Sequence, residues 1–278
     1  MNRTHSLILL HHRQKQDKES ILNLLNASSI IDFIFITWLL IGEFKNMIYR
    51  LLFLCLILLK INPACLSQSN IERDLIDAEQ GDVDAQYNLG IAYSNGIGTA
   101  VDKKKALYWY TKCAEQGDAE AQFNLGVAYS NGEGTLVDKK KAYDWYTKSA
   151  KQGLNVAQNN LGLAYSNGEG TLVDKKKAFY WYTKSAEQGN PIAQNNLGRA
   201  YSNGEGTLVD KKKAFYWYTK SAEQGNPSGQ HNLALAYYYG EATLVDKKKA
   251  ATWMRKAYEN DLELAQETWK NLELWKYE

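Results

Sequence analysis

The sequence predicts an all-α fold, an α/α right-handed superhelical solenoid of five 36-residue helix-turn-helix repeats with a C-terminal capping helix. One glycine recurs every 36 residues, at Gly81, Gly117, Gly153, Gly189 and Gly225. The segment AYSNGEGTLVDKKKAFYWYTKSAEQGN occurs letter for letter at 164–190 and again at 200–226. A helical unit of this size cannot bury its apolar face alone, so we expect neighbouring units to stack into one continuous core.

The first helix of each repeat, helix A, follows from the spacing of its apolar residues. In the first repeat we expect helix A over 82–95, with Ala85, Leu89 and Tyr93 on one apolar stripe that faces the core. Gly96 follows, and glycine is the residue that adopts the left-handed backbone at a helix end without steric cost. Helix A is therefore predicted to end there.

The second helix, helix B, is predicted to begin after an aspartate whose carboxylate accepts the free amides of the first turn. This aspartate recurs as Asp102, Asp138, Asp174, Asp210 and Asp246. In the third repeat, Ala178, Trp181 and Tyr182 fall on one face of the helix. We interpret the aromatic residues as core rather than as a ligand cage.

The amino-terminal residues do not share the repeat. Residues 47–67 have the order of a signal peptide, with Arg50, an apolar run, and small residues before a cleavage site after Ser67. Residues 1–46 are then a misassigned upstream extension, and 68–77 a linker or N-terminal cap. The protein is expected to be secreted or periplasmic. The alternative is that 47–67 remains as a membrane anchor.

Cys113 is the cysteine that remains if residues 47–67 are removed, so no intramolecular disulfide is expected in the mature chain. The other repeats have Ser149, Ser185, Ser221 and Ala257 in its place. We therefore interpret Cys113 as a small buried filler rather than as a reactive thiol.

The repeat pattern is Ala-Gln-x-Asn-Leu-Gly-x-Ala-Tyr, then Gly-x-Gly-Thr, then Asp-x-x-Lys-Ala-x-x-Trp-Tyr-x-Lys-x-Ala-Glu-Gln-Gly. It resembles the Sel1-like repeat family over 78–257, and residues 258–278 are interpreted as the capping helix. The resemblance implies a solenoid related to tetratricopeptide arrays that acts as an adaptor, regulator or secreted factor by binding other proteins. The fifth repeat departs most from the pattern.

Catalysis is not expected, because near-identical repeats present the same groups repeatedly instead of one cluster of unlike residues. The chain has no His-Glu-x-x-His metal motif, no phosphate-binding glycine loop ending in Gly-Lys-Ser/Thr and no Gly-x-Ser-x-Gly nucleophile elbow. No cofactor and no metal are therefore predicted. Some secreted, cysteine-rich members of the resembled family are associated with penicillin binding or β-lactamase activity, so a secreted β-lactamase or cell-wall hydrolase is the alternative. No serine is followed three residues later by lysine, which argues against it.

Lysine triplets occupy the first turn of each helix B, where positive charge opposes the helix dipole. They are Lys103 to Lys105, Lys139 to Lys141, Lys175 to Lys177, Lys211 to Lys213 and Lys247 to Lys249. One interpretation is a basic ridge that makes weak contact with an acidic partner or a membrane surface. The favoured one is a solvated edge balanced by nearby acidic residues, because the net charge is only +2. Nucleic acid is not predicted as a partner.

The best candidate for recognition is where repeats differ at a fixed position while their cores do not. The first helix-A series is Tyr87, Phe123, Asn159, Asn195 and His231. The second helix-A series is Ile91, Val127, Leu163, Arg199 and Leu235. Both are expected to lie off the core stripe and to bind another protein or peptide through the concave helix-A face. A constant series flanks the stripe, and we favour hydrogen bonding between repeats for it: Asn88, Asn124, Asn160, Asn196 and Asn232.

The sequence therefore predicts an exported, non-enzymatic repeat scaffold for protein–protein interaction. A secreted hydrolase and a membrane-anchored adaptor remain as alternatives. Turnover of a chromogenic β-lactam separates the first alternative from the scaffold, and cell fractionation separates the second.

Overall fold

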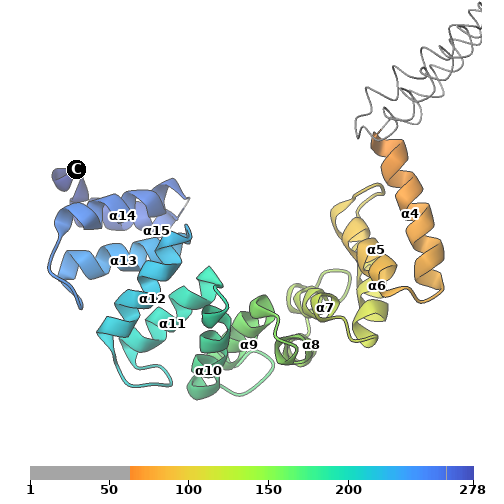
Figure 1. Ribbon diagram of the computed structural model, residues 1–278, viewed down its shortest axis with the longest axis horizontal. Helices are drawn as coiled ribbons and strands as arrows, with labels where there is room; N and C mark the ends of the chain where they lie inside the picture. Colours follow the sequence, from red (N-terminus) through yellow and green to blue (C-terminus); the bar gives the residue numbers. More distant parts are fainter. Residues whose placement is uncertain (1–62, 261) are drawn as a thin grey trace, which may run out of the picture. The chain divides into compact units, whose positions relative to one another are not determined.

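The computed structural model describes residues 63–260 and 262–278, and every regular element in these ranges is helical (Figure 1). The amino-terminal helix is α4 (Pro63–Glu79). The A helices are α5 (Val83–Asn95), α7 (Ala119–Asn131), α9 (Asn155–Asn167), α11 (Pro191–Asn203) and α13 (Pro227–Tyr239). The B helices are α6 (Lys103–Glu115), α8 (Lys139–Lys151), α10 (Lys175–Glu187), α12 (Lys211–Glu223) and α14 (Lys247–Glu259). The carboxy-terminal elements are α15 (Glu263–Asn271) and the 3₁₀ helix η2 (Leu274–Tyr277).

Each A helix packs against the B helix of its own repeat, and each B helix packs against the A helix of the next repeat. Figure 1 shows these helices following one another in chain order along the described repeats. The predicted all-α arrangement of five 36-residue helix-turn-helix repeats is confirmed for this part of the chain.

Helix ends lie where the sequence predicts them. The side chain of Asp82 accepts a hydrogen bond from the backbone amide of Ala85 at 2.8 Å, so α5 begins after Asp82. Gly96 follows the helix with a φ of 74°, in the left-handed region. Asp138 starts α8 in the same way and accepts from the amide of Lys141 at 2.9 Å.

One leucine per A helix lies at the centre of the core, with an exposed fraction of 1% or less. These residues are Leu89, Leu125, Leu161, Leu197 and Leu233. Alanines and one large helix-B residue of each repeat surround them. The core is therefore a row of equivalent clusters, one per repeat.

A glycine in each of the first four A helices permits close contact with a helix-B tyrosine. A Cβ atom added at Gly162 would lie 2.6 Å from the ring of Tyr182, closer than carbon atoms approach. The fifth repeat has Ala234 and Met254 at these two positions, and both are buried. A larger helix-A residue therefore accompanies a slimmer, more flexible helix-B residue.

A second close approach joins neighbouring repeats. Gly170, in the loop after α9, has a φ of 70°, and a Cβ atom there would lie 2.0 Å from the backbone oxygen of Lys139 in the preceding repeat. Gly134 and Gly206 make the equivalent approach in their own loops. The fifth repeat has Ala242 instead, and it keeps a φ of 60° despite its side chain.

Cys113 is completely buried, and its thiol donates to the carbonyl oxygen of Val83 at 3.5 Å. Ser149 makes the equivalent bond to Ala119 at 2.6 Å. Burial raises the pKa of the Cys113 thiol to about 12, so the reactive thiolate is disfavoured. The interpretation of Cys113 as a small filler is confirmed.

The amino-terminal region begins with α4. Residues 68–77, expected as a linker or N-terminal cap, belong to this helix, and Ile71, Leu75 and Ala78 pack against the core of the first repeat. They therefore form a cap. The predicted extension 1–46 and residues 47–62 of the predicted signal peptide or anchor lie outside the described residues. Among the described helices, none has the length and apolar character needed to span a bilayer.

The carboxy-terminal segment 258–278 was expected to be one capping helix, and the structure divides it. Tyr258 and Glu259 complete α14, and α15 and η2 follow. Glu273 separates these two elements because its φ of 50° cannot continue a right-handed helix. Both elements still cover the last repeat, since Ala265 and Leu274 are fully buried against it.

Candidate functional site

The first two residues of the first helix-A series are aromatic and half-buried. The ring of Tyr87 lies 6.1 Å from that of Tyr110, and the ring of Phe123 lies 5.9 Å from that of Tyr146. Each aromatic residue therefore packs on the helix-B tyrosine of its own repeat and keeps part of its surface accessible.

The other three residues of the first helix-A series are buried, so the expectation that this series lies off the core stripe is wrong for them. Asn159, Asn195 and His231 have exposed fractions of 4%, 8% and 7%. The Nδ2 of Asn196 donates to the Oδ1 of Asn159 at 3.0 Å, and that of Asn232 donates to Asn195 at 2.8 Å. These polar side chains are buried because the next repeat satisfies them.

His231 ends this row of hydrogen bonds. Its Nε2 lies 3.1 Å from the hydroxyl of Thr268 in α15, and burial lowers the pKa of the imidazole. The constant asparagines supply the matching side of the row, since Asn124 also contacts the hydroxyl of Tyr87, at 3.4 Å. Hydrogen bonding between repeats, the role favoured for this constant series, is thus confirmed for Asn124, Asn196 and Asn232.

The second helix-A series remains accessible at every repeat. Ile91, Val127, Leu163 and Leu235 are half-buried against the core clusters, whereas Arg199 is exposed. Four partly exposed apolar residues and one arginine therefore occupy equivalent positions on successive A helices. This row is the part of the predicted site that the structure leaves available to a partner.

A pocket of about 130 Å³ lies beside this row, where the second and third repeats meet. It joins α7, α8 and α9, and its lining includes Ser130, Lys139, Tyr143, Tyr146, Asn160, Leu163 and Glu169. The helix-B tyrosines Tyr143 and Tyr146 were interpreted only as core residues. The missed signal is that Tyr143 and Leu163 vary at fixed positions of two facing helices, whereas the leucines of the core do not vary.

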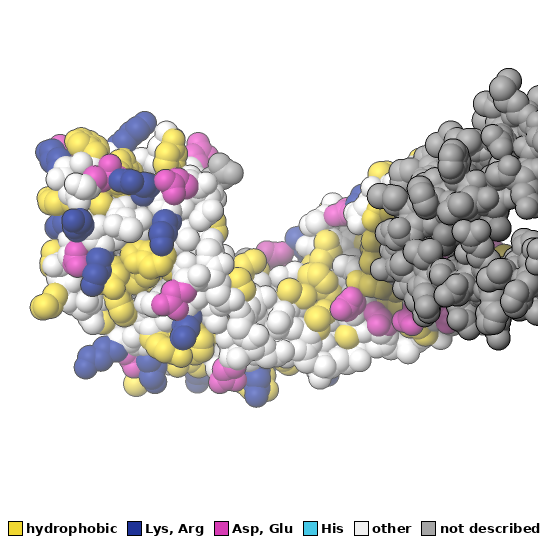
Figure 2. Space-filling model, turned by 45° about the horizontal axis from the view of Figure 1, so that its top comes forward, with side chains coloured by type: hydrophobic (Ala, Val, Ile, Leu, Met, Phe, Trp, Pro, Cys, Tyr) yellow, Lys and Arg dark blue, Asp and Glu magenta, His cyan; other side chains and the backbone are white. Residues whose placement is uncertain are grey.

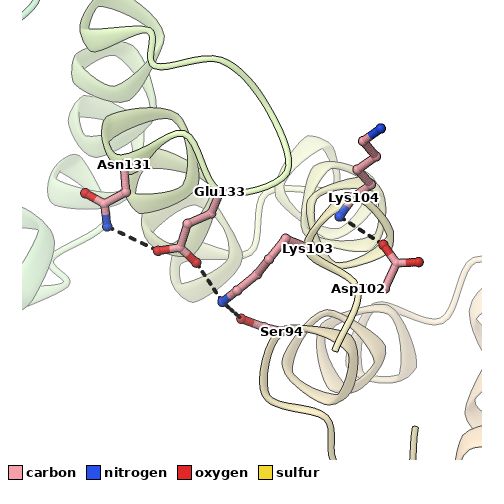
Figure 3. Close-up of polar contacts among 6 residues, drawn as sticks. All are labelled: Ser94, Asp102, Lys103, Lys104, Asn131 and Glu133. Atoms are coloured by element: carbon pink, nitrogen blue, oxygen red, sulfur yellow. Dashed lines mark hydrogen bonds and ion pairs between the residues drawn. The ribbon is translucent and has the colours of Figure 1, made fainter. Parts of the chain in front are cut away.

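The lysine triplets are organised by contacts between repeats. Figure 3 shows Lys103 between Ser94 of its own repeat and Glu133 of the next, at 3.0 Å and 2.7 Å, while the side chain of Lys104 extends away from them. Asn131 donates to the other oxygen of Glu133 at 3.2 Å. The Lys103 and Asn131 contacts lower the pKa of the Glu133 carboxyl, which burial alone would raise.

The first lysines of the next three triplets pair with a glutamate of the following repeat in the same way, at Lys139–Glu169, Lys175–Glu205 and Lys211–Glu241. The third lysines lie near the aspartate that caps their own helix, as Lys177 does with Asp174 at 3.4 Å. Figure 2 shows one face of the molecule, where basic and acidic side chains are interspersed. This geometry agrees with a solvated edge balanced by acidic residues.

Groups for metal-dependent chemistry do not gather in the described part of the chain, which contains no cluster of three or more His, Cys, Asp or Glu side chains able to hold a metal ion. The accessible side chains of the helix-A row are apolar apart from Arg199. The row is therefore suited to binding by burial of apolar surface.

The model of the Sel1 repeat family matches five consecutive segments, 83–118, 119–154, 155–190, 191–226 and 227–262. Each end of this region lies five residues later than the predicted limits of 78 and 257. A search of curated proteins found no match.

Two solved structures resemble the chain closely. A protective antigen of uropathogenic Escherichia coli that displays an SLR fold is 40% identical, with a TM-score of 0.64, over 68% of this chain and 40% of that one. The chain thus corresponds to about two fifths of that antigen's length. A Sel1 repeat protein from Oxalobacter formigenes is 33% identical, with a TM-score of 0.63, over 68% of this chain and 78% of that one.

Proposed function

The chain belongs to the Sel1 repeat family, and from this premise we propose that it is an exported, non-catalytic scaffold that binds a peptide segment of another protein across its A helices. The observation that carries the proposal is the second helix-A series, whose apolar members are half-buried rather than buried in each of the four repeats that contain one. A partner that covers them removes apolar surface from water.

An extended segment fits this row because its contact points repeat once per structural repeat. The apolar side chains at Ile91, Val127 and Leu163 come from three successive A helices, and the pocket between the second and third repeats lies beside the last of them. Alternate side chains of an extended peptide reach such repeated sites, while its backbone passes over the helices. The half-buried rings of Tyr87 and Phe123 widen the row at its amino-terminal end.

The experiment is affinity selection of a synthetic library of random nine-residue peptides on the full chain, followed by sequencing of the retained peptides. We expect retained peptides to be enriched in apolar residues, and Val127→Glu to lower their affinity at least about tenfold, because a charge at that position must be desolvated on binding. Leu136→Glu is the matched control, since Leu136 lies in a loop and is 87% exposed. Equal loss in both variants, or no retained peptide, contradicts the proposal.

The non-catalytic part of the proposal has its own test. We expect the purified full chain to leave a chromogenic β-lactam unhydrolysed at a protein concentration at which a serine β-lactamase gives complete turnover. Steady turnover that survives further purification would instead favour the hydrolase alternative.

Export is proposed from residues 47–67, which read as a signal peptide. That the relative from uropathogenic E. coli is a protective antigen agrees with this location. Cleavage after Ser67 leaves Ile71, Leu75 and Ala78, the residues of α4 that pack on the first repeat. Intact mass of the carboxy-terminally tagged full chain tests it. A mature terminus near Gln68 supports export, whereas a membrane fraction that retains 47–67 favours the anchored adaptor.

A further inference from the structure

Arg199 is the exception in the second helix-A series. The four equivalent residues are apolar and half-buried, whereas Arg199 is charged and exposed on α11. Its guanidinium makes no ion pair within 4.0 Å with any carboxylate of the described residues. A single uncompensated cation therefore stands in an otherwise apolar row.

Tyr182 of α10 adds a second, independent feature. Its side chain is only 3% exposed, and its buried hydroxyl has no hydrogen-bond partner among the described residues. Such a group carries an unmet desolvation cost, which a ligand able to hydrogen-bond with it would relieve.

Arg199 and Tyr182 belong to one site. One repeat earlier, their equivalents Leu163 and Tyr146 line the same junction pocket. Burial raises the pKa of the Tyr182 hydroxyl, while the neighbouring Ser166 and Arg199 act to lower it, so the guanidinium lies close enough to influence the phenol. The hydroxyl of Ser166 already accepts a hydrogen bond from Lys175 at 2.9 Å.

Glu205 is the acidic group nearest to this site, and other residues hold it. Lys175 donates to its Oε2 at 3.1 Å, and Asn203 donates to its Oε1 at 3.2 Å. The negative charge of Glu205 is thus largely balanced without Arg199, and the guanidinium keeps donors free for a ligand.

We propose that Arg199 and the hydroxyl of Tyr182 bind a carboxylate of the peptide that lies along the second helix-A series. The inference rests on the proposed function and names the chemistry of its partner, a peptide with apolar residues and one carboxylate at the fourth repeat. A planar guanidinium binds a carboxylate through two parallel hydrogen bonds, and a phenol donates a third. The carboxylate belongs either to an acidic side chain or to the carboxyl terminus.

The test uses two synthetic libraries of random nine-residue peptides, one ending in a free acid and one in an amide, selected on the full chain. Enrichment of Asp or Glu at one position in both libraries assigns an acidic side chain, and retention confined to the free-acid library assigns the carboxyl terminus. For a selected peptide, replacing the carboxylate by an amide should weaken binding about tenfold. Arg199→Leu should bind the acid and amide forms equally.

The variants separate recognition from folding. Leucine is the residue found at this position in the third and fifth repeats, so Arg199→Leu is expected to keep the melting temperature. Tyr182→Phe removes a hydroxyl that has no described partner, so it should leave stability unchanged while weakening the acid peptide about threefold. Lys212→Leu is the matched control, because it removes one exposed positive charge outside the row.

Two outcomes would overturn the inference, and they differ in what they leave standing. If peptides are retained without acidic preference, or the preference persists in Arg199→Leu, the carboxylate subsite is wrong and peptide binding stands. If neither library yields a retained peptide, the subsite and the proposed function are both wrong.

Discussion

The first four repeats and the fifth repeat solve the same packing problem in different ways. In each of the first four, a helix-A glycine contacts a helix-B tyrosine, whereas the fifth has Ala234 and Met254. The first lysine of helix B pairs with a glutamate of the next repeat in the first four, whereas Lys247 donates to the backbone oxygen of Tyr238. The fifth repeat precedes α15 instead of another repeat, so its departures are adaptations to a different neighbour.

The difference teaches that the positions of this repeat fall into two classes. The central leucine is the same in both regions because it packs within its own repeat. Residues that contact the following repeat change together at the fifth, where no such repeat follows. Stability in such arrays is the sum of contributions within repeats and between neighbours, and the two classes separate these contributions.

The largest expected effect concerns the class that the two regions share. Leu197→Ala and Leu233→Ala should each lower the free energy of unfolding by about 3 kcal/mol, because each leaves a cavity in an equivalent cluster. Urea denaturation followed by far-UV circular dichroism measures this. Leu208→Ala, at an 87% exposed loop position, is the control and should change little. A cost at Leu233 below half of that at Leu197 would show that the two cores are not equivalent.

The next effect tests the paired change. Gly198→Ala should cost about 2 kcal/mol, because the added Cβ would lie 2.6 Å from the ring of Tyr218. Adding Tyr218→Met, which reproduces the pair found in the fifth repeat, should restore most of the loss. Tyr216→Met, at a half-exposed ring on the same helix, should not restore it. Equal rescue by both changes would refute the packing explanation.

A smaller gain is expected where the fifth repeat keeps strain. Ala242 has a φ of 60°, which costs an alanine about 1 kcal/mol relative to its equivalents, which are glycines. Ala242→Gly should therefore raise the free energy of unfolding by about that amount. Ala236→Gly within α13 is the control and should lower it by a similar amount. Unchanged stability in Ala242→Gly would mean that the loop relieves the strain by another route.

The smallest effect concerns the ion pairs between repeats. Contacts from Lys139 and Asn167 hold the pKa of Glu169 below its ordinary value of 4.5. This pair therefore stabilises the fold at pH values above about 4.5 and loses its contribution as the pH falls further. Glu169→Gln should lower stability by about 0.5 kcal/mol at neutral pH and flatten the loss of melting temperature in acid. Lys247→Gln should leave that acid dependence as it is.

Most of the fold was predictable because its determinants are local. Asp82 and Gly96 cap one helix through contacts within a few residues, and the apolar spacing of Ala85, Leu89 and Tyr93 defines its buried face. The same local pattern recurs in every repeat, so a single correct interpretation applied to all five.

The candidate site was predicted only in part. The second helix-A series remains accessible as expected, but Asn159, Asn195 and His231 of the first series are buried. Polar residues near a core stripe read as surface residues when their partners lie 37 positions away in the chain. The unsatisfied hydroxyl of Tyr182 was equally hidden, because the identical segment around Tyr218 looks the same in the sequence.

The sequence by itself determined the helices, their ends, the repeat length and the leucine at the centre of each unit, because these depend on backbone preferences and on spacing within one repeat. Only the tertiary structure decided which variable side chains face a neighbouring repeat and which face the solvent. Burial and hydrogen bonding at those positions depend on atoms that the next repeat supplies, so they follow from how the repeats stack and not from the spacing within any one of them.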